Sequence, residues 1–182
     1  MPKEWLIGDT HFGHTNIIKY CSRPLDADMQ MIQNWSWLVE VDDSVIHLGD
    51  VVLGPDQEEW YRTVFTGLPG RKTLIKGNHD KRSNKYFLEH GWSLVANVLM
   101  RPYKDSLWRK IYFTHMPLNL ELGEYANCAL NVHGHSHNSR PRGVEVSPKH
   151  RLFSIEYENY KPVELSEFLR RENVIEEENL PN

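Results

Sequence analysis

Short apolar segments that lead directly into Asp, Asn and His residues constrain this chain more than any other feature of its sequence. Glu4–Gly8, Ser44–Leu48 and Lys72–Lys76 each have the length and composition of a buried strand, and each is followed by a polar loop. In open α/β sheets, the loops beyond the carboxyl ends of the strands line the ligand crevice. We therefore expect these segments to be strands whose following loops gather at one site.

Helical spacing of apolar residues alternates with these strands in the first half of the chain, and strands predominate in the second half. The expected helices are Leu25–Val41, Gln57–Phe65, Ser83–His90, which Gly91 ends, and a last one from about Val163 to Arg171. The further expected strands are Leu94–Met100, Trp108–Thr114, Ala129–His133 and Leu152–Tyr157, of which the first two form a hairpin or meander. This order indicates an α/β protein with more than one sheet.

The length and composition of the chain are those of an ordinary globular domain. It has 182 residues, of which 40% are hydrophobic and 25% charged, so we expect one domain over residues 1–182 with a frayed acidic tail at about 173–182. It has no apolar run of the ~20 residues that cross a bilayer and no signal-peptide pattern, so we expect a cytoplasmic protein without a membrane partner. Cys21 and Cys128 are isolated, and we interpret them as reduced thiols that take no part in the site.

The placement of the histidines points to a metal site. The chain has 10 His, a high number for its length, and imidazole is the commonest protein ligand of metals. In an extended segment, residues i and i+2 project to the same side, so Asp9 with His11 and His135 with His137 can each direct two ligands at one volume. Glycines, which allow sharp turns and close approach, stand beside the candidate ligands at Gly8, Gly49, Gly77 and Gly134.

The candidate ligands that follow the expected strands are too many for a single ion. They are Asp9, His11, Asp50, Asn78, His115, His135 and His137. A catalytic zinc takes about three protein ligands, whereas two ions roughly 3.5–4 Å apart that share a carboxylate would use them all. Carboxylate, imidazole and amide oxygen together suit Mn²⁺, Fe, Zn²⁺ or Ni²⁺. We therefore expect a binuclear metal site at the carboxyl ends of the strands.

The ordered series DTH, GD, GNHD, H and GHSH resembles the calcineurin-like metallophosphoesterase superfamily. The motifs of that superfamily are D-x-H, G-D, G-N-H-[DE], H and G-H-x-H, and their matches here are Asp9–His11, Gly49–Asp50, Gly77–Asp80, His115 and Gly134–His137. Each motif alone occurs by chance, but the complete ordered series is specific. The match runs from the N-terminus to about residue 137, and the opening DTHFGHTNIIKYCSRP is similar to a subgroup of small bacterial and phage phosphoesterases.

This resemblance implies a fold and a set of metal ligands. The implied fold is a four-layer αββα sandwich, in which two mixed β-sheets pack face to face with helices outside. The implied ligands are Asp9, His11 and His137 for the first ion, Asn78, His115 and His135 for the second, and Asp50 as the bridge between them. The ions would be Mn²⁺ in the first place, with Fe, Ni²⁺, Zn²⁺ or Mg²⁺ as alternatives.

The resemblance also implies a reaction. A hydroxide that bridges the two metals would attack phosphorus in line, and the metals would neutralise the developing charge. His79 would contact the scissile phosphate and protonate the leaving oxygen, while Asp80 would orient or charge-stabilise the His79 imidazole.

The predicted substrate contacts are Asn78, His14, Asn16 and Arg23. Arg23 would bind a phosphate with both arms of its guanidinium, or alternatively form a structural salt bridge with a nearby acid. His14 would either contact substrate or cap the start of a helix.

We expect a phosphodiester or phosphomonoester of small, nucleotide-like structure as the substrate. A nuclease acting on nucleic acid ends is the alternative, and the net charge of −4 counts against binding of long nucleic acid. A metal-binding scaffold without catalysis is a third alternative. Scaffolds of this fold lack the histidine after the Asn, and His79 is present here. The sequence leaves the oligomeric state open.

Overall fold

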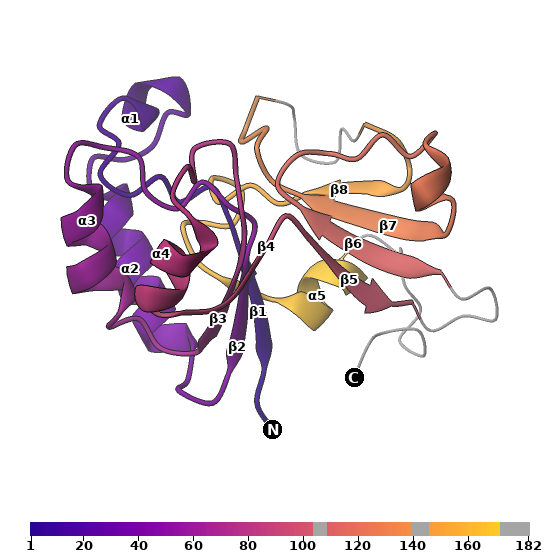
Figure 1. Cartoon of the computed structure of the whole chain (residues 1–182). Helices are drawn as coiled ribbons and strands as arrows, with labels where there is room; N and C mark the ends of the chain where they lie inside the picture. Colours follow the sequence, from indigo (N-terminus) through magenta and orange to yellow (C-terminus); the bar gives the residue numbers. More distant parts are fainter. Residues whose placement is uncertain (104–108, 140–145, 172–182) are drawn as a thin grey trace.

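Two β-sheets form the centre of the molecule, for which a computed structural model describes residues 1–103, 109–139 and 146–171 (Figure 1). The first sheet has the strand order β4-β3-β2-β1-β9, and the second has the order β5-β6-β7-β8. Both sheets are mixed, since each contains parallel and antiparallel pairs. The predicted class, two mixed sheets flanked by helices, is confirmed.

Four parallel strands make up most of the first sheet. They are β1 (Glu4–Ile7), β2 (Ser44–His47), β3 (Arg71–Ile75) and β4 (Trp92–Ala96), with the short antiparallel strand β9 (Val163–Glu164) beside β1. Leu6 pairs with Ile46, which in turn pairs with Thr73. Because parallel strands end at the same edge of a sheet, the loops that follow β1, β2 and β3 lie together.

Most of the helices lie on the outer face of the first sheet, on the left in Figure 1. They are α1 (Ile17–Tyr20), α2 (Ala27–Leu38), α3 (Gln57–Trp60), which continues as a π-helical turn (Tyr61–Phe65), and α4 (Asn84–Glu89). Met31 and Trp35 of α2 are buried at i, i+4 spacing, so they share one face of the helix. The last helix, α5 (Leu165–Arg170), packs beside β1 and β9. No helix in the described part of the chain has the length and hydropathy to span a bilayer.

The second sheet begins with an antiparallel pair and continues with parallel strands. Its strands are β5 (Val98–Pro102), β6 (Lys110–Thr114), β7 (Cys128–His133) and β8 (His150–Leu152), and a 3₁₀ helix (Gly123–Tyr125) lies between β6 and β7. β6, β7 and β8 are parallel to one another. His115, directly after β6, bonds to the carbonyl oxygen of Leu48, directly after β2. The carboxyl ends of strands from both sheets therefore meet.

One hydrophobic core extends from the helices α2 and α4 through the first sheet to the second sheet. Leu6 and Ile46 of the first sheet and Phe113 and Val132 of the second are almost fully buried and belong to one cluster of core residues. Complete burial of such a side chain contributes roughly 1.5–3 kcal/mol relative to leaving it exposed. The loops at the strand ends are thus carried by a packed frame that both sheets share.

One predicted strand is in fact two strands in different sheets. Within the apolar run Leu94–Met100, β4 ends at Ala96, Asn97 forms the link, and β5 begins at Val98 in the other sheet. Apolar patterning identifies a buried strand, but it does not say to which sheet the strand belongs. The predicted hairpin is confirmed as the antiparallel pair β5–β6.

Two predictions near the end of the chain also need correction. The expected strand Leu152–Tyr157 is not formed, because β8 ends at Leu152 and turns follow it. The last helix begins at Leu165 rather than Val163, because Val163 and Glu164 pair with β1 as β9. Trp108, the expected start of a strand, and the acidic tail at 173–182 lie outside the described residues.

Candidate metal centre

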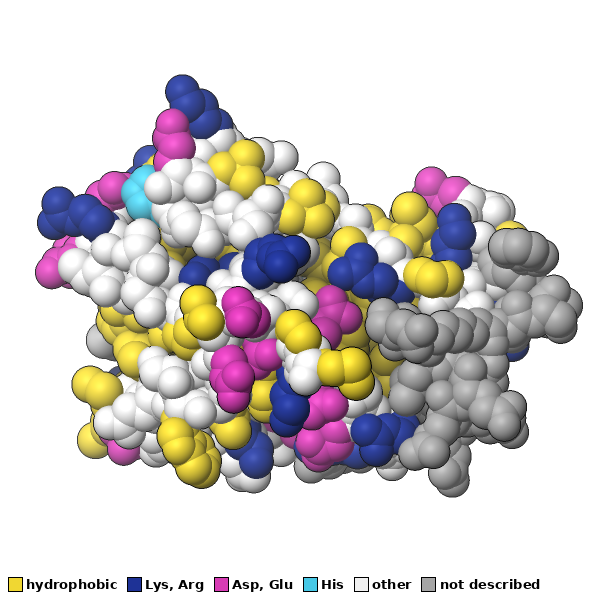
Figure 2. Space-filling model, turned by 90° about the horizontal axis from the view of Figure 1, so that it is seen from below, with side chains coloured by type: hydrophobic (Ala, Val, Ile, Leu, Met, Phe, Trp, Pro, Cys, Tyr) yellow, Lys and Arg dark blue, Asp and Glu magenta, His cyan; other side chains and the backbone are white. Residues whose placement is uncertain are grey.

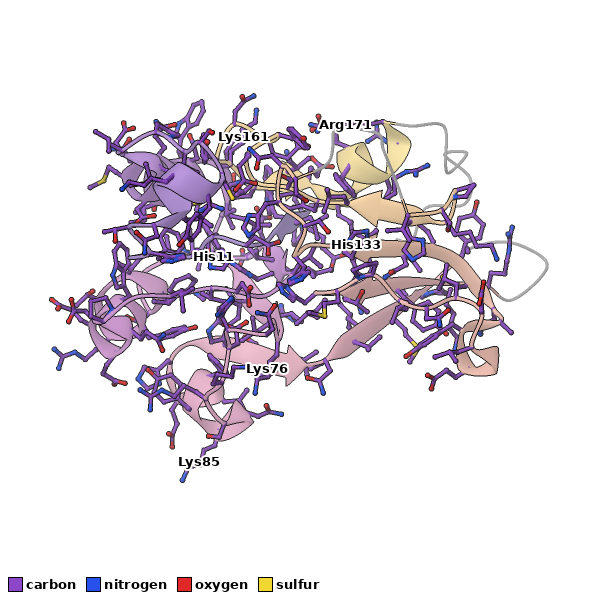
Figure 3. The ribbon with its side chains drawn as sticks, turned by 90° about the horizontal axis from the view of Figure 1, so that it is seen from above. His11, Lys76, Lys85, His133, Lys161 and Arg171 are labelled. Atoms are coloured by element: carbon purple, nitrogen blue, oxygen red, sulfur yellow. The ribbon has the colours of Figure 1, made fainter. Side chains whose placement is uncertain are left out.

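The predicted ligands come together where the strands of both sheets end, around the position labelled His11 in Figure 3. Backbone hydrogen bonds join the loops that carry them. Asp9 N donates to Gly49 O at 2.9 Å, and Gly134 N donates to His115 O at 2.9 Å. The first bond connects the loops after β1 and β2, and the second connects the loops after β6 and β7.

Most of the predicted ligands have a backbone conformation that side-chain-bearing residues rarely adopt. Their φ angles lie between 46° and 68°, in the left-handed region, at Asp9, His11, Asp50, His135 and His137. Each such residue costs about 1–3 kcal/mol, persists only where the surrounding structure holds it, and is typical of functional sites. The loops therefore adopt a strained backbone that directs the ligand side chains, and this strain lowers the stability of the fold.

Glycine is required beside two of the carboxylates. A Cβ atom on Gly134 would collide with the carboxylate of Asp9, and one on Gly77 would collide with the carboxylate of Asp50. The predicted role of these glycines, close approach of the backbone to crowded ligands, is confirmed.

Asp9, His11 and His137 form the first ligand cluster, in which one ligand atom of each lies within 4.8 Å of the others. Both oxygens of the buried Asp9 carboxylate lie 3.0 Å from the His135 backbone nitrogen, which donates to them. Both ring nitrogens of His11 are buried without a hydrogen-bond partner among the described residues. A buried polar atom without a partner costs free energy, and a metal ion bound to one of these nitrogens would reduce that cost. The cluster therefore fits a metal ion.

Asp50, His115 and His135 form the second ligand cluster, and Asn78 joins it. The Nε2 atom of His115 lies 2.9 Å from Asn78 Oδ1 and 3.1 Å from His135 Nδ1. The Nδ1 atom of His115 donates to the Leu48 carbonyl oxygen at 2.8 Å, which leaves Nε2 directed at the cluster. Oxygen and nitrogen ligands thus converge on a second small volume.

Asp50 lies between the two clusters. Its Oδ2 atom is 3.3 Å from His115 Nε2 and 3.6 Å from His11 Nε2. Its Oδ1 atom accepts a hydrogen bond from the His79 backbone N–H at 2.8 Å. A carboxylate between two ligand sets can serve an ion in each, so Asp50 has the position that a bridging role requires.

The ionisable groups of the centre shift one another's pKa. Burial raises the pKa of Asp9 to about 6, against the opposing charges of His115 and His137. Burial would also raise the pKa of Asp50, but its hydrogen bond with His115 lowers it to about 2. Burial opposes protonation of His115, yet the interactions with Asp50 and Asp9 raise its pKa to about 9. Burial lowers the pKa of His11 to about 2, which favours the neutral imidazole that binds metals. The two carboxylates therefore favour positive charge between them, as protons or as a cation.

His79 stands at the rim of the centre and belongs to neither cluster. Its side chain is 40% exposed, and its Nε2 atom lies 4.0 Å from Asp50 Oδ2. Its ring centroid is 5.6 Å from that of His11. The ring is thus close to the ligands and open to solvent, and its catalytic role stays a prediction.

The Asp80 carboxylate is bonded elsewhere than at the His79 ring. It accepts hydrogen bonds from the backbone N–H groups of Asp50 (2.8 Å), Val51 (3.2 Å) and Gly77 (2.8 Å). These bonds engage both oxygens and tie the GNHD loop to the GD loop. The expected orientation of the His79 ring by Asp80 is therefore not found, and the expected charge stabilisation of that ring stays a prediction.

Arg23 forms a structural ion pair, which was the alternative to the predicted phosphate contact. Its side chain has no exposed surface, and its Nη2 atom lies 2.7 Å from Glu156 Oε1. Nη1 donates to the Thr10 carbonyl oxygen at 2.7 Å, and Nη2 donates to that of Asp9 at 2.6 Å. A guanidinium that is buried and bonded in this way cannot reach a substrate phosphate, so we correct the assignment of Arg23.

Glu156 is the candidate functional residue that the sequence did not reveal. Its Oε1 atom lies 3.0 Å from His137 Nδ1, and its side chain is almost fully buried. Cys21, interpreted as uninvolved, also lies here, with its sulfur within 4.8 Å of ligand atoms of His137 and Glu156. Glu156 stands in no motif, and its partner Arg23 is 133 positions away, so no local signal could identify it.

His14 lies beside the centre, and Asn16 follows it directly before α1. The ring centroid of His14 is 5.7 Å from that of His11, and its Nδ1 atom is buried without a hydrogen-bond partner among the described residues. The capping alternative does not hold, because α1 begins at Ile17 after Asn16 and has no side-chain cap hydrogen bond. Contact of His14 and the exposed Asn16 with substrate stays a prediction.

A cavity of about 430 Å³ opens beside the second cluster. Asn78 and His115 line it together with Met116, Leu122 and Tyr125. This volume is within the range of sites that bind small organic ligands. Part of a substrate could therefore lie next to the second cluster.

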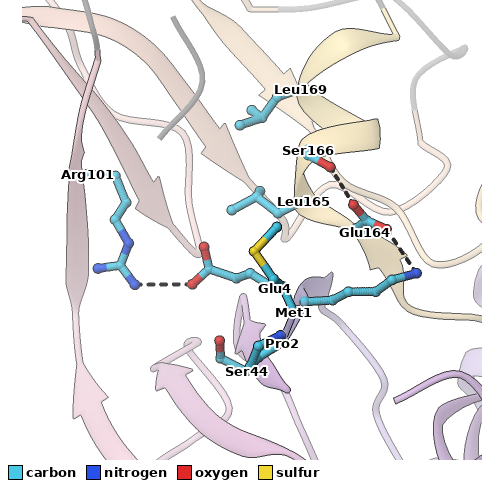
Figure 4. A pocket seen from close by; sticks show the side chains of 10 residues that line it. Met1, Pro2, Glu4, Ser44, Arg101, Glu164, Leu165, Ser166 and Leu169 are labelled. Atoms are coloured by element: carbon cyan, nitrogen blue, oxygen red, sulfur yellow. Dashed lines mark hydrogen bonds and ion pairs between the residues drawn. The ribbon is translucent and has the colours of Figure 1, made fainter. Parts of the chain in front are cut away.

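A different cavity, of about 650 Å³, lies at the opposite edge of the first sheet, where its strands begin (Figure 4). Its charged side chains are paired: Arg101 Nη2 lies 3.2 Å from Glu4 Oε1, and Lys3 Nζ lies 3.3 Å from Glu164 Oε2. Figure 2 shows this face from below, with acidic and basic side chains close together. Because these charges already have partners, this cavity offers a ligand much less than the metal centre does.

Comparison with known proteins agrees with this description. Residues 3–163 match the family model of the calcineurin-like phosphoesterases. The chain is 33% identical over 172 residues to the uncharacterized protein MJ1445 of Methanocaldococcus jannaschii, which covers 91% of this chain and 88% of that protein. It is 24% identical over 178 residues to the Gene 66 protein of Mycobacterium phage D29, covering 82% and 85%. The crystal structure of AQ665, a protein of unknown function from Aquifex aeolicus, has the same fold, with a TM-score of 0.72 and 24% identity over 92% of this chain and 97% of that chain.

Proposed function

The chain belongs to the calcineurin-like phosphoesterase family, and from this premise we propose that it is a binuclear metal-dependent hydrolase of small phosphate esters. The family gives the reaction class. The ligand clusters of this chain support the binuclear site, and the cavity beside them supports a small substrate.

The position of Asp50 between two ligand clusters is the observation that carries this proposal. A site for one catalytic ion needs about three protein ligands, and each cluster here approaches that number by itself. One carboxylate within 3.6 Å of imidazole nitrogens from both clusters favours two ions that share it. Mn²⁺ is the ion that we favour for these mixed oxygen and nitrogen ligands, with Fe, Ni²⁺, Zn²⁺ and Mg²⁺ as alternatives.

Each cluster would hold one divalent ion through its own side chains. The first would be held by Asp9, His11 and His137, the second by Asn78, His115 and His135, and Asp50 would contribute to both. When bound, the two ions would neutralise phosphoryl charge and lower the pKa of water. The strained loops hold the ligand side chains in place beforehand, which reduces the reorganisation that binding requires.

His79 is the proposed general acid. Its exposed ring can approach an ester bound at the rim, and a protonated ring nitrogen can pass its proton to the leaving oxygen. Proton transfer from a positioned side chain contributes about 10²–10⁴-fold in rate.

The 430 Å³ cavity supports a substrate with an organic group about the size of a nucleoside. Tyr125 and Met116 offer aromatic and apolar surface to a planar group, and the amide of Asn97 can bond to its polar edge. His14 and Asn16, on the segment near His11, are further proposed contacts. We therefore favour a nucleotide-like phosphodiester or phosphomonoester.

The test is an assay of the metal-stripped chain to which Mn²⁺, Ni²⁺, Zn²⁺, Mg²⁺ or Fe²⁺ is returned. The esters are mono- and bis-nitrophenyl phosphate, 2′,3′- and 3′,5′-cyclic nucleotides, and short oligonucleotides. We expect turnover of a small ester with at least one metal and none after chelation. If no ester is hydrolysed with any metal, the proposal is wrong; if only oligonucleotides are cleaved, the substrate class is wrong.

A further inference from the structure

Both oxygens of the Glu156 carboxylate are engaged within the fold. Oε1 receives Arg23 Nε at 2.9 Å, Arg23 Nη2 at 2.7 Å and His137 Nδ1 at 3.0 Å, and Oε2 receives Ser154 Oγ at 2.7 Å. An ionised carboxylate only accepts hydrogen bonds, so the Nδ1 proton of His137 lies toward Glu156. The opposite nitrogen, Nε2, is then the ligand atom, and it lies 3.9 Å from Asp9 Oδ1 in the first cluster.

Arg23 extends this support to a second ligand of the same cluster. Its guanidinium donates to the backbone carbonyl oxygens of Asp9 (2.6 Å) and Thr10 (2.7 Å). These bonds hold the segment in which Asp9 has a φ of 52°. A single buried ion pair thus fixes the backbone at Asp9, after β1, and the ring of His137, after β7.

Cys21, His137 and Glu156 also have the residue types of a metal site, since their ligand atoms lie within 4.8 Å of one another. The Arg23 guanidinium, however, lies 2.7 Å from Glu156 Oε1 and 3.5 Å from His137 Nδ1. A fixed positive charge at these distances repels a metal cation. The group therefore supports the first cluster and does not form a third metal site.

The second cluster is supported differently. His115 is oriented by the carbonyl oxygen of Leu48, at 2.8 Å from its Nδ1 atom. That partner is main chain and uncharged. A change in Glu156 should therefore leave the orientation of His115 intact.

We propose that the buried Arg23–Glu156 ion pair is a positioning device for one of the two metal sites, which sets the affinity of the first cluster and leaves the second unaffected. This inference rests on the proposed function, because it assumes that both clusters bind ions. Loss of a partner that orients a ligand histidine typically lowers metal affinity 10–100-fold.

The experiment is a titration of Mn²⁺ into the metal-stripped full chain, in which calorimetry and electron paramagnetic resonance measure the binding of the ions. Glu156→Gln keeps the shape of the side chain and removes its charge. The matched control is Glu158→Gln, because Glu158 is also buried but pairs with Arg171. We expect the affinity of one of two ions to fall about 10–100-fold in Glu156→Gln, and neither affinity to change in Glu158→Gln.

The outcomes separate this inference from the proposed function. If the wild-type chain binds two ions and Glu156→Gln binds both with unchanged affinity, or loses both equally, the positioning role is wrong and the binuclear site stands. If the wild-type chain binds no ion, the proposed function fails as well.

A second measurement uses the unaltered protein, because Glu156→Gln leaves the buried Arg23 charge without its partner and can destabilise the fold. In ¹⁵N spectra of the Zn²⁺-loaded wild-type chain, we expect His137 to carry its proton on Nδ1. A proton on Nε2 would overturn the inference.

Discussion

The two edges of the first sheet are both polar, but they differ in how their polar groups are satisfied. At the edge where the strands begin, the buried Asp43 accepts hydrogen bonds from Lys3 N at 2.7 Å, Trp5 Nε1 at 2.8 Å and Glu40 N at 3.0 Å. At the edge where the strands end, His11 has two buried nitrogens without a partner among the described residues, and its backbone is strained.

This difference separates the part of the molecule that provides stability from the part that provides function. Saturated hydrogen bonds and paired charges lower the free energy of the folded chain. Strained backbone and unsatisfied polar atoms raise it, and they collect where a ligand will complete the structure. Substitutions where the strands begin should therefore reduce stability and spare activity. Substitutions where the strands end should reduce activity and have little effect on stability.

The largest expected effect is that of His79→Ala at the functional edge. Removal of a general acid should lower the rate of ester hydrolysis about 10²–10⁴-fold, while Mn²⁺ binding and the free energy of unfolding stay as in the wild type. The control is His90→Ala, since His90 pairs with Glu58 at a distance from the centre. Steady-state kinetics with a nitrophenyl ester makes the measurement, and wild-type rates in His79→Ala would remove the proposed role.

Gly134→Ala should cause the second largest loss in the rate of ester hydrolysis. The new Cβ atom would collide with the Asp9 carboxylate, so a ligand of the first cluster must move. Displacement of about 1 Å in a catalytic group can cost about 100-fold in rate, and we expect a loss of that order. Gly123→Ala is the matched control, because a Cβ atom there meets nothing within 4 Å. Equal activity of the two variants would contradict the close approach that the structure describes.

Asp43→Asn tests the edge of the first sheet where the strands begin, and it should reduce stability. The variant loses the charge that three buried or partly buried donors share, which should cost about 1–3 kcal/mol in the free energy of unfolding without a change in ester hydrolysis. Urea unfolding of the two chains measures the first quantity, and kinetics measures the second. A loss of activity with unchanged stability would reverse the assignment of the two edges.

The pH dependence of this effect follows from the pKa of Asp43. Burial raises that pKa, but the hydrogen bonds from Glu40, Lys3 and Trp5 outweigh burial and hold it below its usual value of 3.8. The stabilisation by Asp43 is therefore fully present above about pH 4 and is lost as the pH falls through the lower, folded-state pKa. Wild type and Asp43→Asn should converge in stability under acid, and a difference that grows below pH 4 would contradict this sign.

Arg101→Ala should have the smallest effect. Its pair with Glu4 spans 3.2 Å but is about one-third exposed, so we expect a change of at most about 1 kcal/mol in the free energy of unfolding. The same urea titration, repeated at high salt, measures it. A larger loss of stability that persists in high salt would contradict the description of the Arg101–Glu4 pair as a weak, solvent-screened ion pair.

The ligands of the functional edge were predictable from the order of their motifs and from the strands that precede them. β1 ends just before Asp9 and His11 and places them at the sheet edge, as expected. The expected extended segment is wrong, however, because the backbone of both residues is left-handed. Apolar patterning likewise located most of the strands.

The remaining features depend on contacts between distant segments. Glu156 meets Arg23 across 133 positions, and nothing in the sequence near either residue indicates this pair. The left-handed backbone at the ligands lies in loops that are bonded to distant loops, for example through Asp9 N and Gly49 O. Asn97 is an ordinary polar residue inside an apolar run, and only the packing of two sheets makes it the link between them.

The central claim is that two metal ions and ester hydrolysis belong to the same site. The most direct measurement is a Mn²⁺ titration of the metal-stripped chain in which bound ions and hydrolysis of bis-nitrophenyl phosphate are followed together. We expect activity to rise to its maximum as the second ion per chain binds. Full activity with one ion bound, or two bound ions without hydrolysis of this or any other ester of the panel, would contradict the claim.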